Sequence, residues 1–329
     1  MRHKRARYLL LIAGMLSLAL ARASEEDARA WLERMAQAME QLSYQGVFVH
    51  MHDGRAETLQ VVHRNEDGKI AERLMSLDGV GREIISTHNE VQCILPDKRA
   101  VLVEPRKDLN PLLTAVPTYS QKLDRYYRFR MLDTARVAGR AAQQIAVTPR
   151  DGYRYGYMLW LDKATAMPLK SQLRDEDDNI VEQILFASFT LRDDIPNSAL
   201  EPAIDTGGFT WYRSEAKPHV ARQNDTTLWR AVRVPEGFEL QVSNRQVLVG
   251  SEFPVEHLVY SDGLASVSVF VESAESDPDP LDGLSRVGAA NAYTTRVEGH
   301  QVTAVGEVPA PTVEIIAESV RPQTLDARR

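Results

Sequence analysis

The chain has 329 residues and a formal net charge of −7, a length that favours two domains and a charge that argues against nucleic acid as a partner. This acidic balance does not exclude a local basic patch. The single cysteine, Cys93, cannot form an intramolecular disulfide, so each domain must be stabilised by its apolar core. Cys93 lies in a strand-like context, and we interpret it as a buried small hydrophobe.

The N-terminus has the three parts of a secretory signal. Basic residues between Arg2 and Arg7 precede the apolar run Tyr8 to Leu20, and small residues follow at Ala21 and Ala23. The run is too short for a stable membrane-spanning helix, which needs about 20 residues. We therefore expect a signal peptide at 1–23, cleavage after Ala23 and a mature protein in the periplasm of a Gram-negative bacterium. The mature chain then has 34 basic and 46 acidic residues, a net charge of −12.

Residues 24–212 are predicted to form the first domain, which opens with a helix. Apolar residues recur at helical spacing from Ala28 to Leu42, so one face of this helix should pack into a core. After Tyr44 the apolar period changes to two, and Asp-Gly pairs at 53–54, 67–68 and 78–79 mark tight turns. The pattern predicts an antiparallel meander.

A proline-broken apolar stretch, residues 105–121, interrupts this meander. A long loop with this much apolar surface is unusual, and we interpret it as a flap or lid. Apolar residues of the flap and of one strand are the candidate lipid-binding residues: Leu109, Leu112, Leu113, Val116, Met158 and Trp160.

The best candidate metal ligands are His50 and His52, which lie on one face of a strand. The turn at 53–54 places Tyr44 opposite His63, so His63 lies roughly 20 Å from His50 and cannot join them. The acidic run 175–178 is more typical of a solvated hairpin end than of a calcium loop. We therefore predict no metal and no cofactor.

Residues 213–225 are polar and indicate a linker, residues 226–322 a second domain, and 323–329 a tail. The second domain should contain strands from Trp229 onward, with the pair Asp262–Gly263 turning between two of them. A short helix is expected near 284–290, and Pro309 and Pro311 should introduce a last helix that extends to Val320. The predicted fold class is α+β.

Known catalytic signatures are missing from the sequence. It contains no Gly-x-Ser-x-Gly elbow, no His-Glu-x-x-His pair and no glycine-rich phosphate loop. The residues therefore give no sign of a catalytic site, although a hydrolase without a recognisable motif stays an alternative.

Several strings resemble the MucB/RseB family. In the second domain they are Val234–Phe238, His257–Phe270 and Val302–Pro309, and in the first domain Tyr44–Val49 and Tyr157–Asp162. The string Pro168–Ser171 matches too, and the first-domain strings are also similar to lipoprotein carriers of the LolA/LolB type. The family more often has Leu where this chain has Val234, a change that keeps the apolar character.

The resemblance implies a large N-terminal LolA/LolB-like half-closed antiparallel β-barrel with helices and a smaller C-terminal α+β domain. It also implies a periplasmic negative regulator of the sigma-E envelope-stress response. Such a regulator binds the periplasmic domain of a membrane anti-sigma factor of the MucA/RseA type and shields it from proteolysis. Lipid or mislocalised lipoprotein acyl chains are thought to release it. The expected partner-binding residues are Val259, Tyr260, Ser261, Asp262, Gly263 and Leu264.

Besides the hydrolase, one more alternative function stays open at this point. A periplasmic lipoprotein or lipid carrier of the LolA type would share the first domain, but a simple carrier does not need a second one. The oligomeric state is also open, and a homo-oligomer is compatible with the sequence. Recovery of an anti-sigma fragment from periplasm would favour the regulator, and recovery of lipoproteins without it would favour the carrier.

Overall fold

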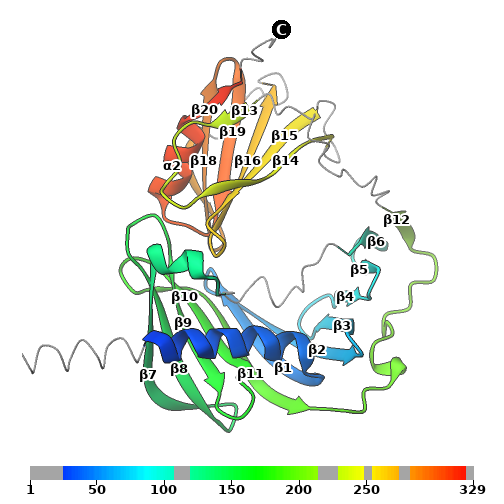
Figure 1. Cartoon of the computed structure of the whole chain (residues 1–329). Helices are drawn as coiled ribbons and strands as arrows, with labels where there is room; N and C mark the ends of the chain where they lie inside the picture. Colours follow the sequence, from blue (N-terminus) through cyan, green and yellow to red (C-terminus); the bar gives the residue numbers. More distant parts are fainter. Residues whose placement is uncertain (1–24, 107–118, 214–228, 248–253, 274–281, 324–329) are drawn as a thin grey trace, which may run out of the picture.

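The computed structural model describes residues 25–106, 119–213, 229–247, 254–273 and 282–323. These residues form a large β domain crossed by a helix and a smaller β domain with one helix against its sheet (Figure 1). The predicted α+β class is therefore confirmed, with a large N-terminal sheet domain and a smaller C-terminal domain. The predicted signal peptide, residues 107–118 of the predicted flap and most of the predicted linker lie outside the described residues. None of the described helices is long and apolar enough to cross a bilayer.

The first domain is built on one 12-stranded sheet. Its order is β12-β6-β5-β4-β3-β2-β1-β11-β10-β9-β8-β7, which leaves β12 and β7 at the two edges. β12 runs parallel to β6, and the other neighbouring strands are antiparallel. In chain order the strands are β1 (Tyr44–His52), β2 (Arg55–Glu66), β3 (Lys69–Ser76), β4 (Glu83–Ser86), β5 (Glu90–Leu95), β6 (Ala100–Pro105), β7 (Tyr127–Val137), β8 (Arg140–Pro149), β9 (Gly156–Asp162), β10 (Pro168–Arg174), β11 (Ile180–Leu191) and β12 (Thr210–Arg213).

Turn chemistry sets the register of this meander. Asp53 and Gly54 both have positive φ, 49° and 69°, as a two-residue hairpin turn of this kind requires. The turn pairs Tyr44 with His63 and His50 with Glu57, so the predicted register is confirmed.

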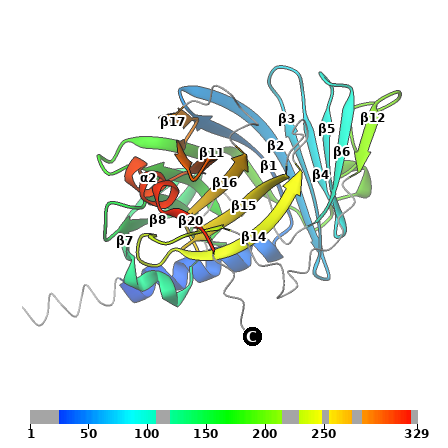
Figure 2. The same cartoon turned by 90° about the horizontal axis from the view of Figure 1, so that it is seen from above.

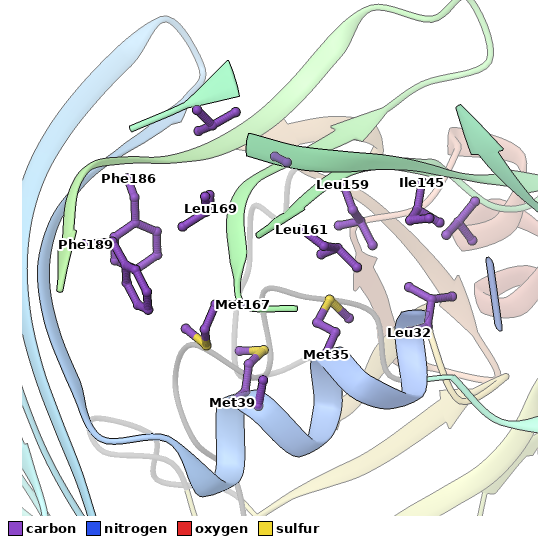
Figure 3. Packing of buried hydrophobic residues seen from close by; sticks show 14 of the residues in the cluster. Leu32, Met35, Met39, Ile145, Leu159, Leu161, Met167, Leu169, Phe186 and Phe189 are labelled. Atoms are coloured by element: carbon purple, nitrogen blue, oxygen red, sulfur yellow. The ribbon is translucent and has the colours of Figure 1, made fainter. Parts of the chain in front are cut away.

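The N-terminal helix, residues 25–41, lies across one face of the sheet (Figure 1). Its apolar side chains Leu32, Met35 and Met39 point at the sheet and meet the main core (Figure 3). All three are at most 2% exposed, so the predicted apolar helix face is confirmed. We call this side of the sheet the inner face. A short 3-10 helix, η2 (Gln121–Arg125), precedes β7, and a second, η3 (Asn197–Ala199), follows β11.

The opposite, outer face of the sheet is covered at one end by the chain that follows β11. Ile204 and Phe209 pack on Ile85 and Val101, while Ile195 and the η3 region pack on β2. The end of the first domain therefore folds back over strands near its beginning, and this covering chain leads into the edge strand β12.

The second domain has a six-stranded sheet in the order β14-β15-β16-β19-β18-β17 and a separate two-stranded pair, β13 with β20 (Figure 1). Its helix α2 packs on β18 and β19 and buries Val313 and Ile316. Its elements are β13 (Trp229–Ala231), β14 (Glu239–Val247), β15 (Pro254–Ser261), β16 (Ser266–Ser273), β17 (Gly283–Val287), β18 (Ala290–Val297), β19 (His300–Gly306), α2 (Ala310–Glu318) and β20 (Val320–Pro322).

Three sequence expectations for local structure were wrong. The helix expected near 284–290 is a hairpin of β17 and β18, because Gly288, with a φ of 62°, turns the chain after a segment too short for a stable helix. Val320 belongs to β20 rather than to the last helix. The strand β12 was missed, and its last residue, Arg213, had been assigned to the linker.

Candidate functional site on the inner face and at the domain interface

A small apolar gap lies between the N-terminal helix and the inner face of the sheet. The residues that line it are Met39, Tyr44, Met167, Pro168, Ser171, Ile184 and Phe186. The Tyr44 hydroxyl is buried and has no hydrogen-bond partner among the described residues. Burial, and secondarily the nearby charge of Glu72, raise the pKa of Tyr44 well above its ordinary value. The gap is therefore apolar apart from neutral hydroxyl groups that can donate a hydrogen bond.

Beyond the helix, apolar side chains form a continuous row across the inner face. Backbone pairing places them side by side on β3, β4, β5, β6 and β12, and we call them the inner-face row: Leu74, Ile84, Cys93, Leu102 and Tyr212. Leu74 pairs with Val61 of β2, a fully buried member of the main core, and this register places the row on the inner face. Exposure rises toward the edge, where Leu102 is 38% and Tyr212 57% exposed.

The cysteine of the inner-face row differs from the sequence expectation. Cys93 is half-buried rather than fully buried, because the N-terminal helix does not cover this part of the inner face. Burial raises the pKa of its thiol, and the charges of Arg82 and Glu104 act in opposite directions. The thiol therefore stays protonated and adds apolar surface to the row.

The candidate lipid-binding residues are not gathered at one place. Leu109, Leu112, Leu113 and Val116 lie outside the described residues. Met158 and Trp160 alternate along β9 with Leu159 and Leu161, which are fully buried beneath the helix. Met158 and Trp160 therefore face the outer side of the sheet, where the ammonium of Lys170 lies 4.3 Å from the Trp160 ring centre. They do not line the apolar gap.

The two domains meet around Arg154, which sits in the loop between β8 and β9. Its Nε donates a hydrogen bond of 2.5 Å to Oδ2 of Asp262 in the second domain, and both side chains are fully buried. The Tyr127 hydroxyl donates to the same Asp262 oxygen at 3.0 Å. Asp151 and the backbone carbonyl of Glu236 accept further hydrogen bonds from Arg154. Burial lowers the pKa of Arg154, but its hydrogen bond and charge interaction with Asp262 outweigh this and raise it.

Aromatic rings enclose this ion pair. The Arg154 guanidinium lies 4.7 Å from the ring centre of Tyr126 and 4.9 Å from that of Phe238. Gly237, between Glu236 and Phe238, has a φ of 93°, and a Cβ there would lie 2.5 Å from the Tyr126 ring. Only glycine fits this approach of the second domain to the first.

Two more hydrogen bonds extend the domain interface along the same loop. The Thr312 hydroxyl of α2 donates to the backbone carbonyl of Tyr153 at 2.8 Å, and the Asn291 side-chain amide donates to the Tyr155 hydroxyl at 3.0 Å. Tyr155 also packs with Ala289 of the second domain. Residues 151–155 of the first domain therefore form the docking site for the second domain. Sequence reasoning missed this role because the segment has no apolar period.

The expected partner-binding residues are placed at this interface or inside the second domain. Asp262 meets Arg154, Leu264 packs against the core of the first domain, and Gly263 faces Leu123. Tyr260 is buried and its hydroxyl accepts a hydrogen bond from the backbone of Ala231. Val259 and Ser261 are half-buried. In this arrangement the turn contacts the first domain, and its role toward another protein stays a prediction.

A crevice between the domains brings two carboxylates together. Glu307 of the second domain faces Glu182 and Tyr157 of the first, and Glu182 contacts His50 Nε2 at 2.5 Å. Burial, followed by the charge of Glu182, raises the pKa of Glu307 to about 7, and His50 acts in the opposite direction. Among the described residues, no group of three or more His, Cys, Asp or Glu could hold a metal ion.

Comparison with known proteins finds the same two-domain pattern elsewhere. The families described as the MucB/RseB N-terminal and C-terminal domains match residues 27–204 and 223–321. The chain is 36% identical to the sigma factor AlgU regulatory protein MucB of Pseudomonas aeruginosa, over 96% of this chain and 97% of that one. It is 28% identical to the sigma-E factor regulatory protein RseB of Escherichia coli K12, over 94% and 96%.

Solved structures agree with these sequence matches. The complex of Pseudomonas aeruginosa MucA and MucB aligns with a TM-score of 0.72 and 32% identity, over 91% of this chain and 99% of that one. A crystal structure of MucB in complex with MucA(peri) aligns with a TM-score of 0.71 and 31% identity, over 90% and 99%.

Proposed function

Because this chain belongs to the MucB/RseB family, we propose that it regulates a sigma-E-type sigma factor by binding the periplasmic domain of a MucA-type anti-sigma factor. The observation that carries this proposal is the match through both domains to MucB chains that were solved with MucA bound. The match covers 99% of each of those chains. A carrier of the LolA type would have no need for the second domain, or for the buried contacts that dock it.

The proposal assigns the chain a binding role in the periplasm, reached after removal of residues 1–23. The relatives are named as regulatory proteins, which supports binding rather than catalysis. While the anti-sigma factor is held, it is shielded from the protease that would cleave it, so the sigma factor stays sequestered.

Lipid is the proposed signal for release of the anti-sigma factor, and the inner-face row is the proposed binding surface for its acyl chain. The row crosses five strands at about 4.8 Å each and offers an apolar track of roughly 19 Å. Each buried methylene contributes about 0.8 kcal/mol, so an acyl chain along the track reaches micromolar affinity after the losses of binding. The predicted flap residues Leu109, Leu112, Leu113 and Val116 are proposed as further contacts of the acyl chain.

The proposal is tested with the mature protein and the purified periplasmic domain of the anti-sigma factor of the same bacterium. Calorimetry should give a one-to-one complex, and a protease that cleaves the free anti-sigma domain should cleave it more slowly in the complex. A lipid A fragment added in excess should restore cleavage. No complex, combined with capture of lipoproteins from periplasm, would instead support a carrier.

A further inference from the structure

One segment of this acidic protein is strongly basic. Residues 121–150 contain seven arginine or lysine side chains and two aspartates, whereas the whole chain carries a net charge of −7. Such charge segregation indicates a surface that meets an anionic partner. The segment covers η2, β7 and β8, so its charges gather at one edge of the large sheet (Figures 1 and 2).

The geometry of β7 turns its arginines outward. Arg128 and Arg130 alternate with Tyr127 and Phe129, which are 1% exposed and belong to the main core. Four exposed side chains form what we call the arginine edge: Arg125, Arg128, Arg130 and Arg136.

The arginine edge has no internal partner. None of its four side chains makes an ion pair or hydrogen bond with any residue in the described part of the chain, whereas the neighbouring Arg140 pairs with Asp162 at 2.9 Å. Charges that serve the fold are normally placed against carboxylates, as Arg73 is against Glu83. The arginine edge is therefore available to a ligand outside the molecule.

We propose that the arginine edge docks this protein on the phosphate headgroups of an anionic lipid bilayer. From Arg128 to Arg136 the strand extends about 26 Å at about 3.3 Å per residue, which suits a row of headgroups better than one small anion. Guanidinium groups bind phosphate with two parallel hydrogen bonds. The acidic remainder of the protein is repelled by the same surface, so the edge also sets the orientation. This surface is separate from the acyl-binding track of the proposed function.

The test is sedimentation of the mature protein with vesicles of phosphatidylcholine alone and of phosphatidylcholine mixed equally with phosphatidylglycerol. The variant is R125Q/R128Q/R130Q. The matched control is R55Q/R230Q/R296Q, which removes the same charge from exposed arginines at other places. Both folds are checked by thermal unfolding. We expect binding only to the anionic vesicles, at least tenfold weaker for the variant and less than twofold weaker for the control.

Other outcomes overturn the proposal. Charged residues on an edge strand also prevent sheets of two molecules from joining. If that is their role, the wild-type protein will not sediment with anionic vesicles, and the variant will associate with itself. Equal weakening by variant and control would show a nonspecific charge effect. Binding to polyglutamate but not to vesicles would assign the arginine edge to an acidic polypeptide.

Discussion

Arg154 and Asp262 form an ion pair across the domain boundary in which both side chains are fully buried. Desolvation of two charges is expensive, so such a pair contributes little to net stability but makes the loss of either partner costly. Tyr127, Asp151 and the Glu236 carbonyl satisfy the remaining groups. The pair therefore specifies one arrangement of the two domains.

Replacing Asp262 with Asn should remove the fully buried counter-charge of Arg154 and leave only the partly exposed carboxylate of Asp151 to balance it. We expect a loss of about 3 kcal/mol or more in the free energy of unfolding, because buried charges tolerate the loss of a partner poorly. Urea unfolding, followed by tryptophan fluorescence, measures it. The control is Asp178→Asn, which breaks an ion pair with Arg174 whose carboxylate is 78% exposed. That change should cost less than about 1 kcal/mol. Equal losses in the two variants would contradict the role of the buried pair.

Gly237→Ala should disturb the docking of the domains more than a glycine replacement elsewhere. The new Cβ would meet the Tyr126 ring at 2.5 Å, in addition to the strain of a φ of 93°. The matched control is Gly139→Ala, where φ is 77° and no atom lies within 4 Å of the new Cβ. The control should cost about 1 kcal/mol from backbone strain alone. The interface variant should cost more, and Tyr126→Ala should recover part of the difference. Equal losses of unfolding free energy in the two variants would mean that the interface accommodates the new Cβ without a cost in stability.

The local parts of this fold could be predicted from the sequence, and the long-range parts could not. Asp53–Gly54 specifies a hairpin turn by its own backbone preference, so the pairing of Tyr44 with His63 followed. Arg154 and Asp262 are 108 residues apart, and no period or motif connects them. The string around Asp262 stood out through its resemblance to a family, but only the structure gives the first domain as its neighbour.

Misread segments have a physical cause as well. Residues 284–290 contain few strong strand formers, and their edge strand β17 exists because it pairs with β18. The inner-face row was not recognised because its members come from five strands with one residue each, and such a row appears only when the register is known. Met158 and Trp160 were chosen as large apolar residues. Alternation along β9 places them on the face away from the helix, and their contact with lipid stays a prediction.

Stability should decline between mildly acidic and mildly alkaline pH because of Glu307. Its pKa is raised from an ordinary 4.5 to about 7 by burial and by Glu182, so the folded protein holds this proton more tightly than the unfolded chain. The contribution is fully present below the ordinary carboxyl pKa and is lost as pH rises through about 7. Its amplitude should be modest, because the Glu307 residue is exposed at the rim of the crevice and solvent screens its interactions.

Glu307→Gln checks this pH dependence, because the amide stays neutral at every pH. Its free energy of unfolding should change less between about pH 5 and about pH 8 than that of the wild type. The control is Glu314→Gln, which removes a carboxylate of α2 that does not line this crevice. If the free energy of unfolding depends on pH in the same way in wild type and Glu307→Gln, then Glu307 does not cause the decline in stability.

Leu102→Asp should weaken the binding of a fatty acid or lipid A fragment without unfolding the protein. The side chain is 38% exposed at the open end of the inner-face row, and an aspartate there places a charge on the acyl track. A titration with a fluorescent fatty acid should show at least tenfold weaker binding, about 1.4 kcal/mol. Leu284→Asp, at a 53% exposed leucine of the second domain, is the matched control. Unchanged affinity in Leu102→Asp would place the acyl chain elsewhere, for example beneath Leu112 and Leu113.

Lipid and anti-sigma factor should weaken each other's binding by the same factor, since coupling between two ligands is reciprocal. We expect at least tenfold, about 1.4 kcal/mol. The coupling must act through an element with two arrangements, and the candidates are the domain interface around Arg154 and the predicted linker 213–225. Asp262→Asn separates them, because it loosens the interface and leaves the linker intact. If the interface transmits the signal, the variant should lose most of the lipid effect on anti-sigma affinity. If the full tenfold effect persists in a folded variant, the Arg154–Asp262 pair does not carry the coupling.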